Sequence, residues 1–98
     1  MDIRFELNGT TFVWNEAKAA VNPRRHDGVT FEQAATVFFD PFFRLVDASR
    51  QDESRDAVIG FDATGRLLFV VHVERNNETI RIVSARKATK QERAEHDS

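Results

Sequence analysis

The sequence predicts an α+β fold with a mostly antiparallel sheet. Six stretches show either the alternation of apolar and polar side chains or the run of β-branched and aromatic residues that is typical of strands. Three other stretches begin with an N-cap residue followed by a helical pattern. In chain order the elements are two strands, two helices, four strands and one helix. We therefore expect one domain over residues 1–98, with two N-terminal helices packed on one face of the sheet and a short C-terminal helix.

The chain begins with a β-hairpin. Residues 3–7 alternate apolar and polar side chains, as a half-buried strand does. The pair Asn8-Gly9 follows, and this pair is a strong signal for a two-residue turn. Residues 10–14 form the returning strand. Trp14 ends this strand, and we expect its large ring to pack in the core rather than to stack on a base.

The first helix is expected to be short. Asn15 is a good N-cap for it. A proline in a helix interior removes one backbone hydrogen bond and clashes one turn back, at a cost of about 3 kcal/mol. Pro23 therefore predicts that the helix ends near Val21, with Arg25 rotated away from Lys18. A continuous helix would instead project Lys18 and Arg25 from one face.

The second helix has clearer signals. Thr30 and Gln33 have the spacing of a capping box. Four apolar residues follow at spacings of three and four, and these are Phe31, Ala34, Ala35 and Phe38. This periodicity predicts a core-facing stripe rather than a platform for base stacking. Asp40-Pro41 ends the helix.

Four strands are expected in the second half of the chain, at residues 42–46, 57–61, 67–73 and 79–87. The third of them is apolar at every position except His72, so it should be a central strand that is covered on both faces. His72 is then a core histidine with its hydrogen bonds satisfied. Polar residues 47–56 indicate an exposed loop, and Asn76-Asn77 indicates a tight turn.

The last helix is expected over residues 90–98. Thr89 and Glu92 again have capping-box spacing. Ala94 is the only apolar residue in this segment. Because such a helix buries almost no apolar surface by itself, we expect it to fray or to lean on a partner.

Composition limits the possible functions. The chain has no cysteine, which excludes disulfide scaffolds, thiolate zinc sites and cysteine nucleophiles. Its three histidines share no spacing, so we expect no metal site and no cofactor. We see no signal peptide or membrane span, which favours a cytoplasmic location and no membrane partner. The net charge of −2 means that any contact with RNA must come from a local patch.

Positive charge is concentrated around the end of the last strand. Residues 79–90 contain Arg81, Arg86, Lys87 and Lys90 and no acidic residue. Guanidinium groups on a rigid strand suit a polyanion such as RNA, because their planar forks bind phosphate through two hydrogen bonds. The alternative is a surface strand whose arginines pair with acids. Strand alternation places Arg81 and Arg86 on opposite faces, so they share a site only if a bulge or the strand end re-aims one of them.

The order of these motifs resembles the BrnT family. The matching segments are residues 12–15, 28–29, 31–34, 37–40, 80–90 and 92–93, with Lys18, Asn22, Arg25 and His26 spaced between the first two. The resemblance extends over nearly the whole chain, from residue 12 to residue 93. The sequence also departs from the family pattern: Asn15 replaces an aspartate, Asp27 replaces a glycine, and residues 52–55 only approximate an acidic-acidic-Arg run.

The resemblance implies a RelE-like fold and a ribonuclease toxin of a type II toxin–antitoxin system that inhibits translation. It also implies a BrnA-like antitoxin with a ribbon-helix-helix DNA-binding part. Toxin and antitoxin together would repress their own promoter, so this chain would contact DNA only through the antitoxin.

The implied chemistry is RNA cleavage without a metal ion, in which the neighbouring 2′-hydroxyl attacks the phosphate. We expect Arg55, Arg81 and Arg86 to stabilise the charge of the transition state. Lys18, Arg25 and Lys87 would position the RNA backbone.

His26 is the candidate acid and base, because histidine titrates near neutral pH. The alternative for His26 is a helix-end side chain that is hydrogen-bonded to backbone carbonyls. The alternative for the whole protein is a catalytically weak or inactive binding module that acts with its antitoxin in promoter repression.

Overall fold

The computed structural model describes residues 1–49, 54–76 and 78–98. Its elements are β1 (Asp2–Leu7), β2 (Thr10–Asn15), α1 (Glu16–Arg25), α2 (Phe31–Thr36), the 3₁₀ turn η1 (Val37–Phe39), β3 (Arg44–Asp47), β4 (Asp56–Phe61), β5 (Leu67–Arg75), β6 (Thr79–Lys87) and α3 (Lys90–Asp97). The α+β class and the chain order are confirmed. Part of the expected 47–56 loop and Asn77 of the expected turn lie outside the described residues.

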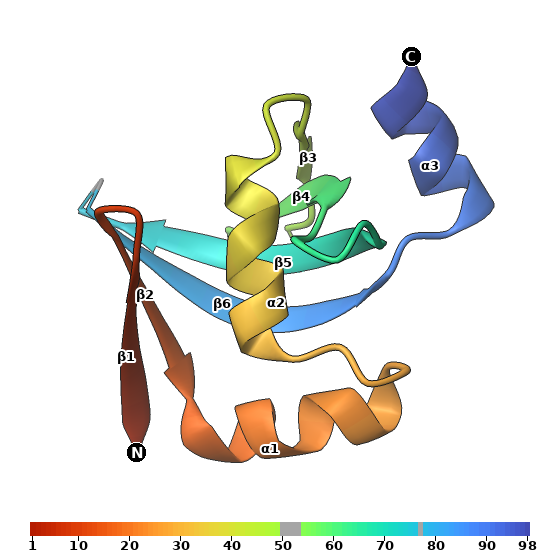
Figure 1. The fold of residues 1–98 in the computed structure, drawn as a ribbon. Helices are drawn as coiled ribbons and strands as arrows, with labels where there is room; N and C mark the ends of the chain where they lie inside the picture. Colours follow the sequence, from red (N-terminus) through yellow and green to blue (C-terminus); the bar gives the residue numbers. More distant parts are fainter. Residues whose placement is uncertain (50–53, 77) are drawn as a thin grey trace.

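The sheet is mixed: four of its five strand pairings are antiparallel, and one is parallel. Its strand order is β1-β2-β6-β5-β4-β3 (Figure 1). The pairings β1–β2, β6–β5, β5–β4 and β4–β3 are antiparallel, as consecutive strands predict. β2 and β6 pair in parallel. Local sequence signals cannot show this pairing, because it joins strands that are more than sixty residues apart.

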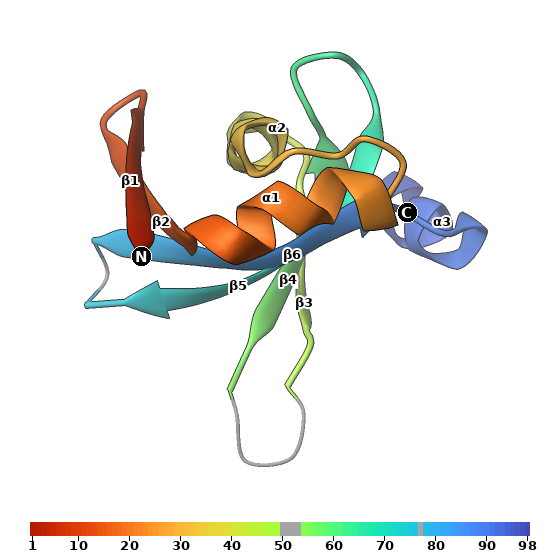
Figure 2. The same ribbon diagram turned by 90° about the horizontal axis from the view of Figure 1, so that it is seen from below.

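The prediction that two N-terminal helices pack on one face is wrong. α2 lies across β5 and β6 and covers one face of the sheet, whereas α1 runs alongside β6 (Figures 1 and 2). The reason is that β2 pairs with β6 only as far as Arg81. α1 lies beside the part of β6 that follows, and the Asn22 side chain bonds both backbone groups of Ala85 there.

α1 continues through its proline, so the prediction that it ends near Val21 is also wrong. The backbone after Pro23 is well satisfied, since His26 N–H donates to the carbonyl of Asn22 at 2.9 Å and Gly28 N–H donates to that of Pro23 at 2.8 Å. The buried hydrogen bonds of Asn22 hold this turn against the sheet, and they offset the loss caused by the proline.

The core lies between α2 and the sheet, as expected. Phe12, Trp14 and Phe31 are at most 1% exposed. The rings of Trp14 and Phe31 meet edge to face, with centroids 5.8 Å apart. The capping box of Thr30 and Gln33 is present at the start of α2 and fixes where its apolar stripe begins. Burying each large side chain contributes about 1.5–3 kcal/mol.

The strand β5 is central, but it is fully covered on only one face. Val70 and His72 are buried against the α2 side. Phe69, Val71 and Val73 alternate with them on the other face and are half-buried. The prediction that this strand is covered on both faces is therefore wrong, and its second face takes part in the site described below.

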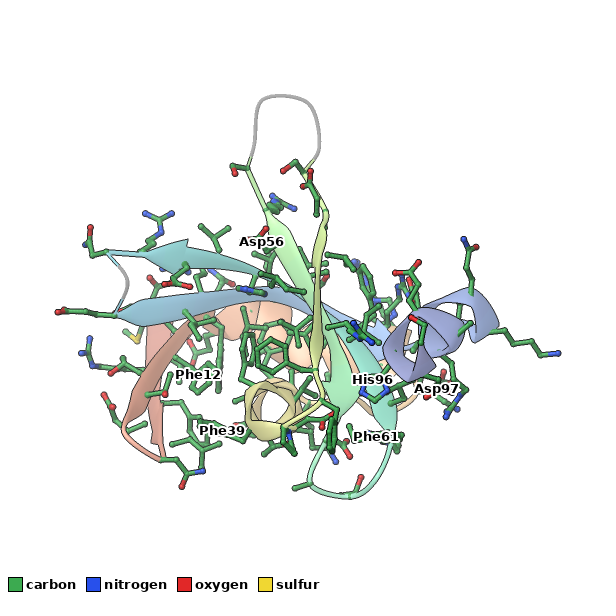
Figure 3. The ribbon with its side chains drawn as sticks, turned by 90° about the horizontal axis from the view of Figure 1, so that it is seen from above. Phe12, Phe39, Asp56, Phe61, His96 and Asp97 are labelled. Atoms are coloured by element: carbon green, nitrogen blue, oxygen red, sulfur yellow. The ribbon has the colours of Figure 1, made fainter. Side chains whose placement is uncertain are left out.

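α3 contacts the sheet through residues near both of its ends. Near its start Glu92 pairs with Arg86 of β6, and near its end His96 has a side chain that is only 6% exposed. His96 Nε2 lies 3.1 Å from Asp40 Oδ2, and its ring packs edge to face on Phe61 at a centroid distance of 5.2 Å (Figure 3). None of the helices in the described residues is long and apolar enough to cross a membrane.

Candidate functional site

A bulge in β6 brings Arg81 and Arg86 to the same face of the sheet. His72 of β5 lies opposite Ile82 and Val71 lies opposite Ser84, so Val83 is an extra residue on β6. Because of this shift Arg81 lies opposite Val73 and Arg86 lies opposite Phe69, on the half-buried face. The structure thus contains the bulge that Arg81 and Arg86 need in order to share a face.

This face forms the floor of a groove of about 520 Å³. One wall is α1, and the other is the hairpin of β3 and β4, which extends on the side of the sheet away from α2 (Figure 2). Five of the seven residues proposed from the sequence line the groove, and these are Lys18, Arg25, His26, Arg55 and Arg86.

The α1 wall exists because the helix does not stop at its proline. Lys18, Asn22 and Arg25 follow one another at helical spacing and all line the groove. Within the described part of the chain, the side chains of Lys18 and Arg25 have no ion pair or hydrogen bond. They can therefore meet an anion without first giving up a carboxylate.

His26 is the C-cap residue of α1. Its backbone N–H donates to the Asn22 carbonyl, and its own carbonyl accepts from Val29 N–H at 3.0 Å. His26 lines the groove, and its ring has no hydrogen bond to the residues that the structure describes. The contacts that end the helix are thus made by the backbone of His26, and the imidazole remains accessible to a ligand.

Arg86 lies in the groove but is already paired. Its Nη1 and Nη2 atoms are 2.8 and 2.9 Å from the two carboxylate oxygens of Glu92 in α3. The guanidinium carbon lies 4.3 Å from the centroid of the Phe69 ring, which gives a cation–π contact. The hydrogen bond with Glu92 raises the pKa of Arg86, so this side chain carries a fixed positive charge.

Arg81 does not line the groove. It lies near the start of β6, where its Nη2 atom is 2.6 Å from Asp2 Oδ2 of β1. This hydrogen bond is the main reason why the pKa of Asp2 is lowered and that of Arg81 is raised. The alternative that strand arginines pair with acids therefore describes Arg81 better than a role in catalysis does.

Lys87 also lies outside the groove. It is opposite Leu68 of β5, and Leu68 belongs to the face that α2 covers. Arg55 lines the groove just before β4. Arg50, Asp52 and Glu53, which precede Arg55 in this hairpin, are outside the described residues, and so is most of the acidic-acidic-Arg run.

The groove has further lining residues that sequence reasoning missed. Asp47 and Ser49 come from the end of β3, and Phe69 and Val71 come from β5. Hydrogen bonds from the Ser49 side chain and its N–H lower the pKa of Asp47, so among the described residues one carboxylate lines the groove beside the cations. Strand alternation predicts that Phe69 and Val71 share a face, but only the register of β6 shows that Arg86 joins them.

His72 is buried, as predicted, and packs edge to face against Phe38. Its Nδ1 atom has no hydrogen-bond partner among the described residues, so the prediction that all its hydrogen bonds are satisfied is not confirmed. Burial lowers the pKa of this ring. In residues 1–49, 54–76 and 78–98, no three His, Asp or Glu side chains come together as a metal-binding group.

The comparisons with known proteins identify the family. A search of curated proteins gives no match. The family model for "Ribonuclease toxin, BrnT, of type II toxin-antitoxin system" matches residues 14–92, a range that begins at the core tryptophan and ends at the partner of Arg86. The match includes both walls and the floor of the groove. The chain therefore belongs to the BrnT family of ribonuclease toxins from type II toxin–antitoxin systems.

Proposed function

We propose that the groove between α1 and the β3–β4 hairpin binds RNA and cleaves it without a metal ion. The observation that carries this proposal is the gathering of Lys18, Arg25, Arg55 and Arg86 around one groove in a protein whose net charge is −2. Three segments contribute these cations: α1 supplies Lys18 and Arg25, the residue before β4 is Arg55, and β6 supplies Arg86. A local concentration of positive charge on an anionic protein favours a phosphate ligand.

The cleavage that suits these residues uses the 2′-hydroxyl of the RNA as the nucleophile. A base removes its proton, the 2′-oxygen bonds to phosphorus, and the bond to the 5′-oxygen breaks as that oxygen receives a proton. The products are a 2′,3′-cyclic phosphate and a 5′-hydroxyl. Arg86 and Arg55 would stabilise the added negative charge on phosphorus, and Lys18 and Arg25 would hold the flanking phosphates.

His26 would act as the acid or base in this scheme. His26 lines the same groove as the cations, and its helix-capping contacts use only the backbone. We expect His26→Gln to lower the cleavage rate about 10²-fold or more, since a general acid or base contributes on that scale. Its melting temperature should stay close to that of the unsubstituted protein. A loss of stability with no change in rate would support the helix-end role instead.

The direct test is incubation of the purified protein with RNA in EDTA, followed by analysis of the product ends. Cyclic phosphate ends support the proposal, and intact RNA rejects it. Arg86→Ala should lower the rate about 10²-fold or more, as the loss of one transition-state donor does in other enzymes. Lys18→Ala should mainly weaken binding.

We also propose that the cleavage inhibits translation in the cytoplasm and that a BrnA-like ribbon-helix-helix antitoxin covers this groove. An antitoxin that supplies carboxylates to Lys18 and Arg25 would block the site most simply. DNA would be bound only by the antitoxin. Co-expression tests this: Lys18→Glu with Arg25→Glu should weaken antitoxin binding, and unchanged binding would place the antitoxin elsewhere.

A second function is supported by a specific observation. Arg81 and Arg86 are both paired with carboxylates, and Asp47 adds a negative charge to the groove. These pairs favour a binding module that acts with its antitoxin in promoter repression and has weak or no ribonuclease activity. Repression of the promoter by a complex whose toxin leaves RNA intact would support this second function.

A further inference from the structure

Glu92 holds Arg86 in one orientation from outside the groove. Its two carboxylate oxygens accept from Nη1 and Nη2 of Arg86, at 2.8 and 2.9 Å. Arg86 lines the groove, whereas Glu92 does not. The carboxylate therefore lies behind the guanidinium as seen from the groove.

Glu92 is itself fixed by the start of α3. Thr89 N–H donates to Glu92 Oε1 at 2.9 Å, and Glu92 N–H donates to Thr89 Oγ1 at 3.2 Å. The Glu92 side chain is 15% exposed. At the other end of the helix, buried His96 contacts Asp40 and Phe61. The position of the carboxylate is thus set at both ends of α3.

The remaining donors of Arg86 form a fork. A guanidinium has five N–H groups. Glu92 takes one from each terminal nitrogen, and the carbonyl of Lys87 takes the second one on Nη1, at 3.2 Å. Among the described contacts this leaves the N–H on Nε and one on Nη2. These two point the same way, and a pair of this kind binds two oxygens of one phosphate.

We propose that Glu92 is a positioning residue for RNA cleavage, which turns the Nε–Nη2 fork of Arg86 toward the scissile phosphate. The inference rests on the proposed ribonuclease function. Phe69 supports the same orientation, because the guanidinium carbon lies 4.3 Å from its ring centroid. The opposing possibility is that Glu92 inhibits the protein by occupying Arg86. If Glu92 positions Arg86, removing its carboxylate lowers the cleavage rate, and if Glu92 inhibits, removing it raises the rate.

The test measures kcat and KM for RNA cleavage in Glu92→Ala, Glu92→Gln and the matched control Thr89→Ala. Thr89→Ala removes the hydroxyl that caps α3 but leaves the carboxylate in place. We expect both Glu92 variants to lose about 10- to 100-fold in kcat with little change in KM, since small misplacements of catalytic groups have effects of this size. The kcat of Thr89→Ala should stay within about threefold of that of the unsubstituted protein, because the Glu92 carboxylate is still present to orient Arg86.

A double-mutant cycle separates positioning from a general structural effect. If Glu92 acts through Arg86, adding Glu92→Ala to Arg86→Ala should cause no further loss of kcat. Equal losses in both backgrounds would assign Glu92 to the stability of α3 alone and overturn the proposal. An unchanged or increased kcat in Glu92→Ala would overturn it as well. If the unsubstituted protein does not cleave RNA, the proposed function fails first, and that result is distinct from these.

Discussion

Asn22 connects α1 to β6 beyond the end of the β2–β6 pairing. Its Nδ2 atom donates to the carbonyls of Val29 at 2.8 Å and Ala85 at 2.9 Å, and its Oδ1 atom accepts from Ala85 N–H at 3.4 Å. The residue is 5% exposed, although asparagine is usually found on surfaces. One side chain thus serves as the edge partner of β6 and fixes the wall of the groove.

The stability of Asn22→Ala tests this role. Buried backbone groups that lose their partners cost about 1–3 kcal/mol each, so we expect a loss of about 3 kcal/mol in total. Asn15→Ala is a matched control, because Asn15 is the exposed N-cap of the same helix and its loss should cost about 1 kcal/mol. Urea denaturation measures both values. Equal losses would show that Asn22 has no special role in holding α1.

The two strand arginines should differ strongly in their importance for cleavage. Arg86 lies in the groove, whereas Arg81 pairs with Asp2 outside it. We expect Arg86→Ala to lower the cleavage rate about 10²-fold or more, and Arg81→Ala to stay within about threefold. Rates measured on the same RNA at saturating concentration would decide this. Comparable losses in both variants would return Arg81 to the catalytic set.

At the level of elements, short sequence patterns correctly predict where helices begin and where the last strand begins and ends. Both capping boxes are present, at Thr30 and at Thr89, and β6 has the predicted bounds. The errors concern relations between distant segments. The bulge at Val83 and the parallel β2–β6 pairing depend on register, which no short pattern encodes. α1 passes Pro23 because a tertiary contact outweighs the local cost.

The same limit explains how much of the site could be predicted. Residue chemistry identified the cations and His26, and the family resemblance supplied their roles. Neither could show that Arg81 pairs with Asp2 or that Asp47 enters the groove, because these contacts join residues far apart in the sequence. Side-chain type predicts which residues can bind phosphate, and the fold decides which of them meet.

The contact between α3 and the sheet should depend on pH. Asp40 accepts from Phe61 N–H and Phe42 N–H, both at 2.9 Å, and contacts His96. Burial acts to raise the pKa of Asp40, but these hydrogen bonds outweigh it and lower the pKa below the usual value of 3.8. A carboxylate with a lowered pKa stabilises the folded state above the pKa of the unfolded chain. This contribution is lost as the pH falls through the folded value.

Asp40→Asn tests the pH dependence. The variant should be less stable than the unsubstituted protein at pH 7, because an amide cannot accept all of these hydrogen bonds. The difference in the free energy of unfolding should shrink as the pH falls from neutral to well below 3.8, the usual pKa of this carboxyl group, because Asp40 then becomes protonated. Chemical denaturation across this range measures it. A difference that does not change with pH would contradict the assignment.

On the scale of the whole molecule, charge is distributed unevenly. The chain carries 16 acidic and 14 basic residues, so its overall charge does not attract RNA. In the part of the chain that the structure describes, four cations line the groove, although Arg86 is paired with Glu92 and Asp47 opposes them. RNA binding should therefore depend on a few local contacts and release few counterions. This separates the protein from strongly basic RNA-binding domains, in which many lysines contribute.

The salt dependence of RNA binding measures the number of these contacts. For a single strand, the slope of log Kobs against log salt concentration is about −0.7 per phosphate neutralised, so four cations predict a slope no steeper than about −2.8. RNA with 2′-O-methyl groups lacks the nucleophile and allows binding to be measured without cleavage. Lys18→Ala should make the slope shallower by about 0.7, and Asp47→Asn should tighten binding because it removes a negative charge from the groove. A slope near zero, or one that Lys18→Ala leaves unchanged, would show that RNA does not bind in this groove.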